Sequence, residues 1–325
     1  METEFFVRIE NVYCNEMALV LMKEILKRAV SEGYTVPAFN VFDYETLLAV
    51  AEAAEMSSSP VIIQMSMGAR KHVSKPDVFV RLMKDVAENT NAPIALNHDH
   101  CTSPDNARQA IDLGFSGVMF DGSGLSFEDN IKRTREIVTY AGPDVAVEAE
   151  FGMLPGFEDR VFSEHALFTD PDQAKEFVES SGCFSLAVSV GTSHGGVVAE
   201  APLTLHMDIL RRIHESLPGF PLVLHGAASL PVFLIDLVNE QGGKVEYLKN
   251  CSEDDISKVG AFGVAKANMD VDNFLCFTRE VRRILREKAE KYDPRLYLRP
   301  AREAFRDEVC HKMKNVVLSA GKSWL

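Results

Sequence analysis

Three histidines stand just past short apolar runs in this chain of 325 residues. His100 follows the run 94–96, His194 the run 186–190 and His225 the run 222–224. A buried strand that ends in histidine delivers a ligand to the rim of a sheet, and three imidazoles with one open position are typical of a catalytic zinc site. A lone histidine is usually structural, but this trio predicts a metal centre.

Amides, hydroxyls and carboxylates follow the other apolar runs in the same way. The residues in these positions are Asn40, Gln64, Ser66, Asp99, Asp121, Glu150, Asn268 and Asp270. If the runs are parallel strands, all of these side chains meet the histidines at one rim. We therefore expect a single active site built from the ends of many strands.

Eight apolar runs must supply the elements that position these side chains. They are residues 36–39, 61–65, 94–96, 118–120, 145–149, 186–190, 222–224 and 263–266. The segments between them mostly carry a helical pattern, which is typical of repeated strand–helix units. The sequence predicts the α/β class and, within it, a (β/α)8 TIM barrel.

Helix boundaries support this assignment. Ser103 and Asp170 each precede a proline, so a capping side chain stands before a residue whose missing N–H costs nothing at a helix start. Residues 273–290 and 301–318 read as additional C-terminal helices. We expect an N-terminal extension over 1–16 and one barrel domain, with these helices, over 17–325.

Composition excludes some partners. The formal net charge of −14 argues against binding nucleic acid or an anionic membrane, which both require a basic surface. No apolar stretch approaches the roughly 20 residues that span a bilayer. The six cysteines form no CxxC pair, so reduced thiols are expected. These features favour a cytoplasmic protein that acts on a small molecule.

The segment from His98 to His100 leaves two kinds of metal chemistry open. Amidohydrolase-type enzymes also use a His-x-His strand, but there it is the first strand, whereas two runs precede it here. An aldolase would use zinc to polarise a ketone and stabilise the enediolate that forms when a carbon–carbon bond breaks. Asp99 would then handle the hydroxyl proton. Spacing also permits His98 as a fourth ligand, because residues two apart share a face of a strand.

At this point the chain, from about residue 17 to 313, resembles the class II, metal-dependent fructose-bisphosphate and tagatose-bisphosphate aldolases. The matching segments are 36–40, 96–100, 121–123, 147–152, 191–195, 225–227, 263–268 and 293–298. The resemblance implies a (β/α)8 barrel and Zn²⁺, or another divalent ion, held by the three histidines. It also implies a monovalent cation as a further candidate cofactor.

The resemblance implies roles for several carboxylates. Asp99 would exchange the hydroxyl proton, and Glu158, on the loop after the fifth strand, would act as acid and base at the carbon next to the ketone. An exposed loop carboxylate is the alternative for Glu158, because the preceding residues depart from the usual acidic pair. Asp121 and Glu150 match positions that support the metal or offer it an alternative site.

Other positions match groups that contact substrate, and some of them have changed. Asn40, Ser66, Asn268 and Asp270 keep the expected types. Where the family places a lysine, a serine and a threonine near phosphate, this chain has Val198, Ala228 and Val271, and Phe274 stands where an arginine is common. The remaining candidates for substrate contact are Gly195, Gly226 and Ser229, the glycines through their backbone N–H groups.

A phosphate without cationic or hydroxyl partners is costly to bury, so ordinary fructose 1,6-bisphosphate becomes a doubtful substrate. The leading hypothesis is a zinc-dependent aldolase for a ketose or a related phosphorylated sugar. A ketose-bisphosphate aldolase that uses dihydroxyacetone phosphate, held by backbone groups, is the second. A non-catalytic binding or regulatory relative is the third. Family analogy also suggests a homodimer or homotetramer.

Overall fold

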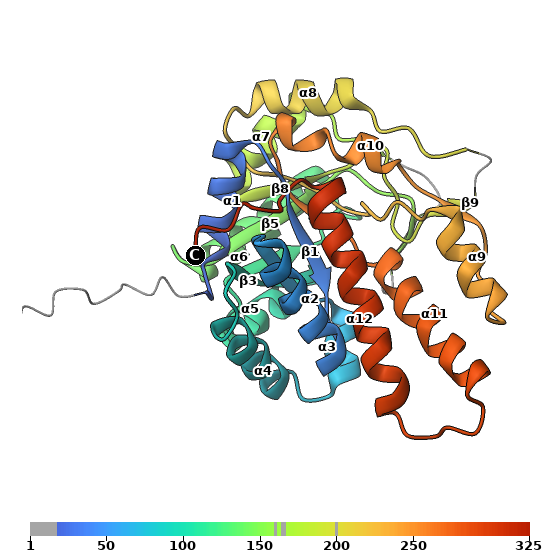
Figure 1. Ribbon diagram of the computed structural model, residues 1–325. Coiled ribbons are helices and arrows are strands. Elements are labelled where there is room, and N and C mark those ends of the chain that lie inside the picture. The colour runs from blue at the N-terminus through green and yellow to red at the C-terminus, as the bar shows by residue number, and fades with distance from the viewer. Residues whose placement is uncertain (1–17, 159–160, 164–166, 199–200) are drawn as a thin grey trace, which may run out of the picture.

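The chain folds around a closed barrel of eight parallel strands in this computed structural model, which describes residues 18–158, 161–163, 167–198 and 201–325 (Figure 1). The strands are β1 (Val36–Asn40), β2 (Val61–Met65), β3 (Ile94–Cys101), β4 (Gly117–Phe120), β5 (Ala146–Phe151), β8 (Ser185–Val188), β10 (Leu222–Leu224) and β12 (Val264–Asn268). Sequential strands are neighbours, and β12 closes onto β1. The predicted TIM barrel is confirmed. The expected extension over 1–16 lies outside the described residues.

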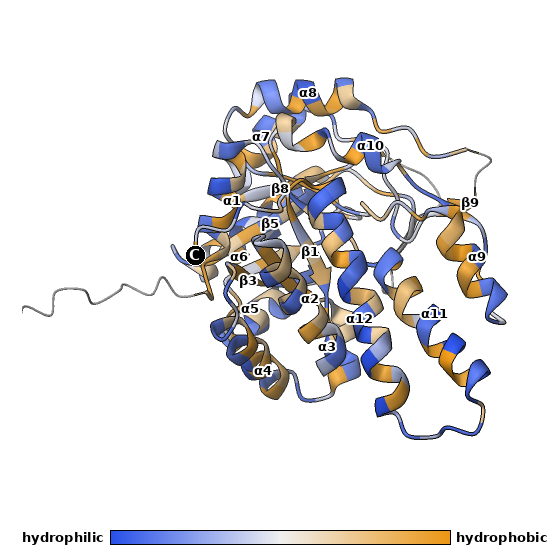
Figure 2. Cartoon of the chain, in the orientation of Figure 1, coloured by the Kyte–Doolittle hydropathy of each residue, from blue (hydrophilic) through white to orange (hydrophobic). Residues whose placement is uncertain are grey.

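Helices surround the barrel, and Figure 2 shows that they carry both hydrophilic and hydrophobic residues. They are α1 (Met22–Glu32), α2 (Tyr44–Ser57), α3 (Met67–Val73), α4 (Pro76–Glu88), α5 (Pro104–Leu113), α6 (Phe127–Ala141), α7 (Pro171–Ser181), α8 (Met207–Ser216), α9 (Val232–Glu240), α10 (Glu253–Ile256), α11 (Val271–Glu287) and α12 (Arg295–His311). As expected, the side chains of Ser103 and Asp170 cap α5 and α7. None of the described helices is long and apolar enough to cross a membrane.

Helix α1 closes the N-terminal mouth of the barrel. Its Met22, Ile25 and Leu26 are buried against small and branched residues of the strand starts, among them Ala38 and Ala265. Apolar packing therefore fills the end of the barrel that lies away from the predicted rim. The polar residues collect at the opposite end, where the strands terminate.

Strand β3 runs further than its apolar part predicts and is irregular at its end. Its pairing with β4 shifts register between His98 and Cys101, and His100 adopts a φ of 45°. The extra residue of a bulge changes which face a side chain points to. The side chains of His98 and His100 therefore need not lie on one face of β3.

The C-terminal helices bind the loops at the rim. Helix α12 packs against α2 and α11, and the three lie side by side at one edge of the barrel in Figure 1. Just past α12, the fully buried Lys312 contacts Glu253 at 2.7 Å, Asp272 at 2.7 Å and Glu308 at 3.2 Å. Asp272 also accepts the backbone N–H of Ser229 at 2.9 Å. The loop after β10 is thus anchored through Lys312.

This anchor predicts an acid-sensitive contribution to stability. The hydrogen bond from His311, together with Lys312, lowers the pKa of Glu253 from its ordinary value of 4.5 to about 2. A depressed carboxyl pKa contributes stability above pH 4.5 that is lost as the pH falls toward 2. We expect Glu253→Gln to have a lower free energy of unfolding than the wild type at pH 7, measured by urea unfolding. The difference between the two proteins should shrink as the pH falls toward 2. The control Glu179→Gln, at an exposed ion pair, should change little; equal effects of both variants would contradict the assignment.

Candidate metal centre and active site

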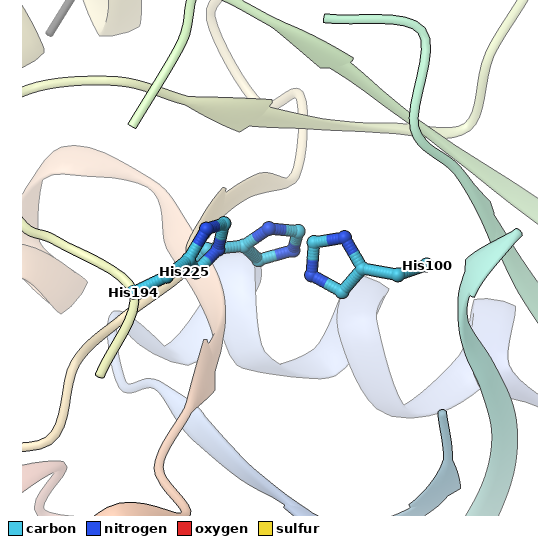
Figure 3. Close-up of side chains that lie close together, drawn as sticks. All are labelled: His100, His194 and His225. Atoms are coloured by element: carbon cyan, nitrogen blue, oxygen red, sulfur yellow. The ribbon is translucent and has the colours of Figure 1, made fainter. Parts of the chain in front are cut away.

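The three histidines converge at the C-terminal rim, as Figure 3 shows. His100 comes from the end of β3, while His194 and His225 follow β8 and β10. The ring centroid of His100 lies 5.2 Å from that of His194 and 4.8 Å from that of His225. One ligand nitrogen of each ring lies within 4.8 Å of the others, a spacing that fits a shared metal ion.

The hydrogen bonding and protonation of these nitrogens show whether the three histidines suit a cation. His194 Nε2 and His225 Nδ1 are buried and make no hydrogen bond, and neither does the buried Oε2 of Glu150. Burial and the neighbouring His100 and His225 lower the pKa of His194, which favours the neutral imidazole that metals bind. Buried polar atoms without a partner are costly, so the donor set suits a divalent ion.

Asp121 and Glu150 lie beside the histidines. Asp121 Oδ2 is 3.5 Å from His100 Nδ1, and Glu150 Oε2 is 3.5 Å from His225 Nδ1. His100, Asp121 and Glu150 also form a second group whose ligand atoms lie within 4.8 Å of one another. Their placement suits either support of the first site or an alternative position for the ion.

A buried row of charges orients His225. Its Nε2 lies 2.8 Å from Glu148 Oε1, so Nδ1 is left to face the other histidines. Lys266 Nζ contacts the two oxygens of Glu148 at 3.1 and 2.8 Å, and all three residues are almost completely buried. A carboxylate behind a ligating imidazole fixes its tautomer and ring plane.

Asp99 sits inside a ring of donors. Asn40 and Gln64 each donate an amide N–H to Oδ2 at 3.1 Å, and Asn268 donates to Oδ1 at 3.2 Å. Burial opposes its charge, but His100 and Lys266, whose Nζ lies 3.9 Å away, hold the pKa of Asp99 below its usual range. The carboxylate is therefore ionised and fixed in one orientation.

A cavity of about 310 Å³ is lined by Asp99, His100 and His194, and Gly226, next to His225, also lines it. Its lining includes most of the predicted substrate contacts, namely Asn40, Ser66, Gly195, Gly226, Ala228, Asn268, Asp270 and Val271. The amide oxygens of Asn40 and Asn268 are buried without a hydrogen bond, so they can accept a hydroxyl of a bound molecule. Burial raises the pKa of Asp270 to about 6.

Some candidates lie elsewhere. The hydroxyl of Ser229 contacts Glu253 and Asp272 at 3.1 Å, and this residue does not line the cavity. Val198 is 77% exposed on β9 (Val197–Val198), away from the cavity. Glu158 ends β6 (Gly156–Glu158), which pairs with β7 (Val161–Ser163), but its side chain lies outside what the structure describes.

His98 is not a fourth ligand in the described arrangement. Its Nδ1 lies 3.3 Å from the Sγ of Cys101, and its ring packs edge-on against Phe115 with centroids 5.4 Å apart. The register shift in β3 separates it from His100, so the two-residue spacing does not place both rings on one face. Cys101 is likewise buried away from the cavity.

Two residues of the site, Glu148 and Lys266, were missed by sequence reasoning. Glu148 lies two residues before the predicted Glu150 in β5, and this spacing is a signal that both share one face of the strand. Lys266 is a charged residue inside a strand that is buried throughout, which also signals an internal ion pair.

The fold and the site together define an α/β barrel in which three histidines are placed to hold a metal ion and a buried, ionised carboxylate lies beside them. The sequence profile of the family described as fructose-bisphosphate aldolase class-II matches residues 20–322. The chain therefore belongs to the class II fructose-bisphosphate aldolase family, whose members are metal-dependent lyases.

Individual relatives agree. A fructose-bisphosphate aldolase of Treponema pallidum is 37% identical over 94% of this chain and 98% of its own length. A fructose-bisphosphate aldolase of Thermus caldophilus is 38% identical over 91% of this chain and 97% of its own length. The crystal structure of the YdjI aldolase from Escherichia coli K12 superimposes with a TM-score of 0.73 at 29% identity, covering 94% of this chain and 99% of that one.

Loss of a single histidine should be measurable as lost metal affinity. We expect His194→Ala to weaken zinc binding by more than the roughly 10–100-fold that loss of an outer partner costs, because a direct ligand is removed. Competition with a chromophoric chelator gives the affinity. His206→Ala, at a ring that packs on Phe168, is the matched control. Unchanged affinity in the His194 variant would remove this residue from the ligand set.

Proposed function

We propose that this protein is a zinc-dependent aldolase that reversibly cleaves a carbon–carbon bond of a ketose or a related phosphorylated sugar. The observation that carries the proposal is the grouping of His100, His194 and His225 beside a cavity that the fixed carboxylate of Asp99 also lines. Zinc held by the three imidazoles would supply a Lewis acid that stabilises negative charge on the substrate's ketone oxygen.

The chain's own residues would move the protons. In cleavage, Asp99 takes the proton of the hydroxyl on the carbon that becomes the aldehyde. The bond to the neighbouring carbon breaks, and its electron pair passes toward the ketone. Glu158 then returns a proton to the carbon next to the ketone. The amides of Asn40, Gln64 and Asn268 support this assignment, because their hydrogen bonds favour the ionised carboxylate of Asp99 and fix its orientation.

Removal of this carboxylate separates proton transfer from metal binding. We expect Asp99→Ala to lower kcat for cleavage by about 10²–10⁴-fold, the usual contribution of a positioned acid or base. Zinc content, measured by atomic absorption, should stay at the wild-type level, because the three histidines are retained. Full activity would overturn the proposed role of Asp99 in proton transfer. Loss of zinc would show that Asp99 is needed for metal binding instead.

The walls of the cavity support a substrate other than standard fructose 1,6-bisphosphate. Ala228, Val271 and Phe274 line it, and the ring of Phe274 lies 5.6 Å from that of Phe42, also a lining residue. Among the described residues, no lysine or arginine lines this cavity. A phosphate here would lack the charged partners that usually hold it.

A phosphorylated donor held by backbone groups is the second candidate. Gly195 and Gly226 line the cavity, both with positive φ. Successive N–H groups in such turns form concavities that bind anions. The relatives named fructose-bisphosphate aldolase also favour this candidate. Arg70 does not line the cavity and donates to Gln109 at 2.7 Å.

A substrate panel distinguishes the two. We expect the zinc-loaded protein to cleave unphosphorylated or singly phosphorylated ketoses with a higher kcat/KM than fructose 1,6-bisphosphate, and a chelator to abolish all turnover. The variant A228S/V271T should raise kcat/KM for the phosphorylated ketoses by about tenfold or more, because each new hydroxyl gives a hydrogen bond to a charged group. Chelator-insensitive cleavage would refute the metal mechanism, and preference for the bisphosphate would favour the second candidate.

Cellular location and assembly stay predictions from the sequence. Cys101, Cys183 and Cys251 are buried free thiols, which supports a reducing compartment such as the cytoplasm. The homodimer or homotetramer is likewise expected from family analogy alone.

A further inference from the structure

Asn250 lies between the two loops that carry His194 and His225. It is 2% exposed and directly follows β11 (Leu248–Lys249). It does not line the cavity and was not among the residues that the sequence singled out.

The side-chain amide of Asn250 is fully used. Its Nδ2 donates to the carbonyl oxygen of Ser193 at 2.9 Å and to that of Gly226 at 2.8 Å. Its Oδ1 accepts the backbone N–H of Ser193 at 3.2 Å and of Cys251 at 3.0 Å. Ser193 precedes one histidine of the metal centre and Gly226 follows another, so a single side chain ties both ligands together.

The two loops approach each other closely, so only a small donor or cation fits between their carbonyl oxygens. A Cβ on Gly226, whose φ is +59°, would lie 2.3 Å from the oxygen of Ser193. Both carbonyls point to the Asn250 nitrogen, and among the described residues no other N–H is found on either. Two buried carbonyl oxygens that converge repel each other unless a donor or a cation lies between them.

Asn250 is itself held in place from two sides. Strand β11 pairs antiparallel with β9 of the His194 loop, with Leu248 opposite Val198 and Lys249 opposite Val197. The backbone oxygen of Asn250 accepts the N–H of Leu203 at 3.1 Å. The amide therefore reaches the two carbonyls from a fixed backbone rather than from a free loop.

We propose that Asn250 is a positioning residue that sets the spacing of His194 and His225, and that its amide nitrogen takes the place of a monovalent cation between the carbonyls of Ser193 and Gly226. The inference rests on the metal site proposed above. A monovalent cation between these two carbonyls would hold them together, and here the Asn250 amide does so instead. Divalent metal binding and turnover therefore need no monovalent ion at this position.

Removal of the amide should create a need for that ion. In Asn250→Ala the two carbonyls lose their donor, and we expect Co²⁺ affinity, measured by the absorption bands of the bound ion, to fall by about 10–100-fold in tetramethylammonium buffer. K⁺ or NH₄⁺ should restore it, because these ions are small enough to accept two carbonyl ligands. The wild-type protein should bind Co²⁺ equally well in all three buffers.

Asn239→Ala is the matched control, because Asn239 also makes two side-chain bonds to backbone, both to Val245, but far from the metal centre. It should bind Co²⁺ as the wild type does in every buffer. Asn250→Asp keeps the acceptor, loses the donor and adds a negative charge, so its dependence on K⁺ should exceed that of the alanine variant. It serves as the second variant if Asn250→Ala does not fold.

Two results would overturn the proposal. One is a wild-type protein whose Co²⁺ affinity depends on K⁺. The other is a variant at Asn250 that keeps wild-type affinity without K⁺, or whose loss neither K⁺ nor NH₄⁺ restores. Because the readout is metal binding, a protein that binds Co²⁺ but cleaves no ketose would refute the aldolase proposal and leave this test intact.

Discussion

The charge of Lys266 in the middle of the barrel is the constraint on which the site depends. A completely buried ammonium is stable only with anionic partners, and it has Glu148 at 2.8 Å and Asp99 at 3.9 Å. Glu148 also fixes the ring of His225, so one cation orients both a metal ligand and the carboxylate that moves protons. Loss of Lys266 would leave two buried carboxylates without this cation, so the barrel's stability and its chemistry depend on the same contacts.

The barrel and its rim were predictable because their signals are local. Each strand is a short apolar run, and each polar residue stands at the end of one, so parallel pairing alone brings His100, His194 and His225 together. The position of His98 was not predictable in this way. Its face depends on a register shift at the end of β3, which involves pairing with a different segment of the chain.

The connections between strands were least accessible to sequence reasoning. Ser229 has the residue type of a ligand contact, but Lys312 and its carboxylates, far along the chain, draw its hydroxyl away from the cavity. Asn250 acts on backbone oxygens, which any sequence would provide, so no pattern of side chains marks its partners. Such contacts appear only when loops that are distant in sequence lie side by side.

The φ of 45° at His100 links the metal centre to the economy of the whole fold. A residue with a Cβ in this region costs about 1–2 kcal/mol relative to glycine. Exchange for glycine would relieve this backbone strain, but it would also remove the contact with Asp121 and one support of the Asp99 charge. Backbone conformation and side-chain contacts thus act in opposite directions at one residue.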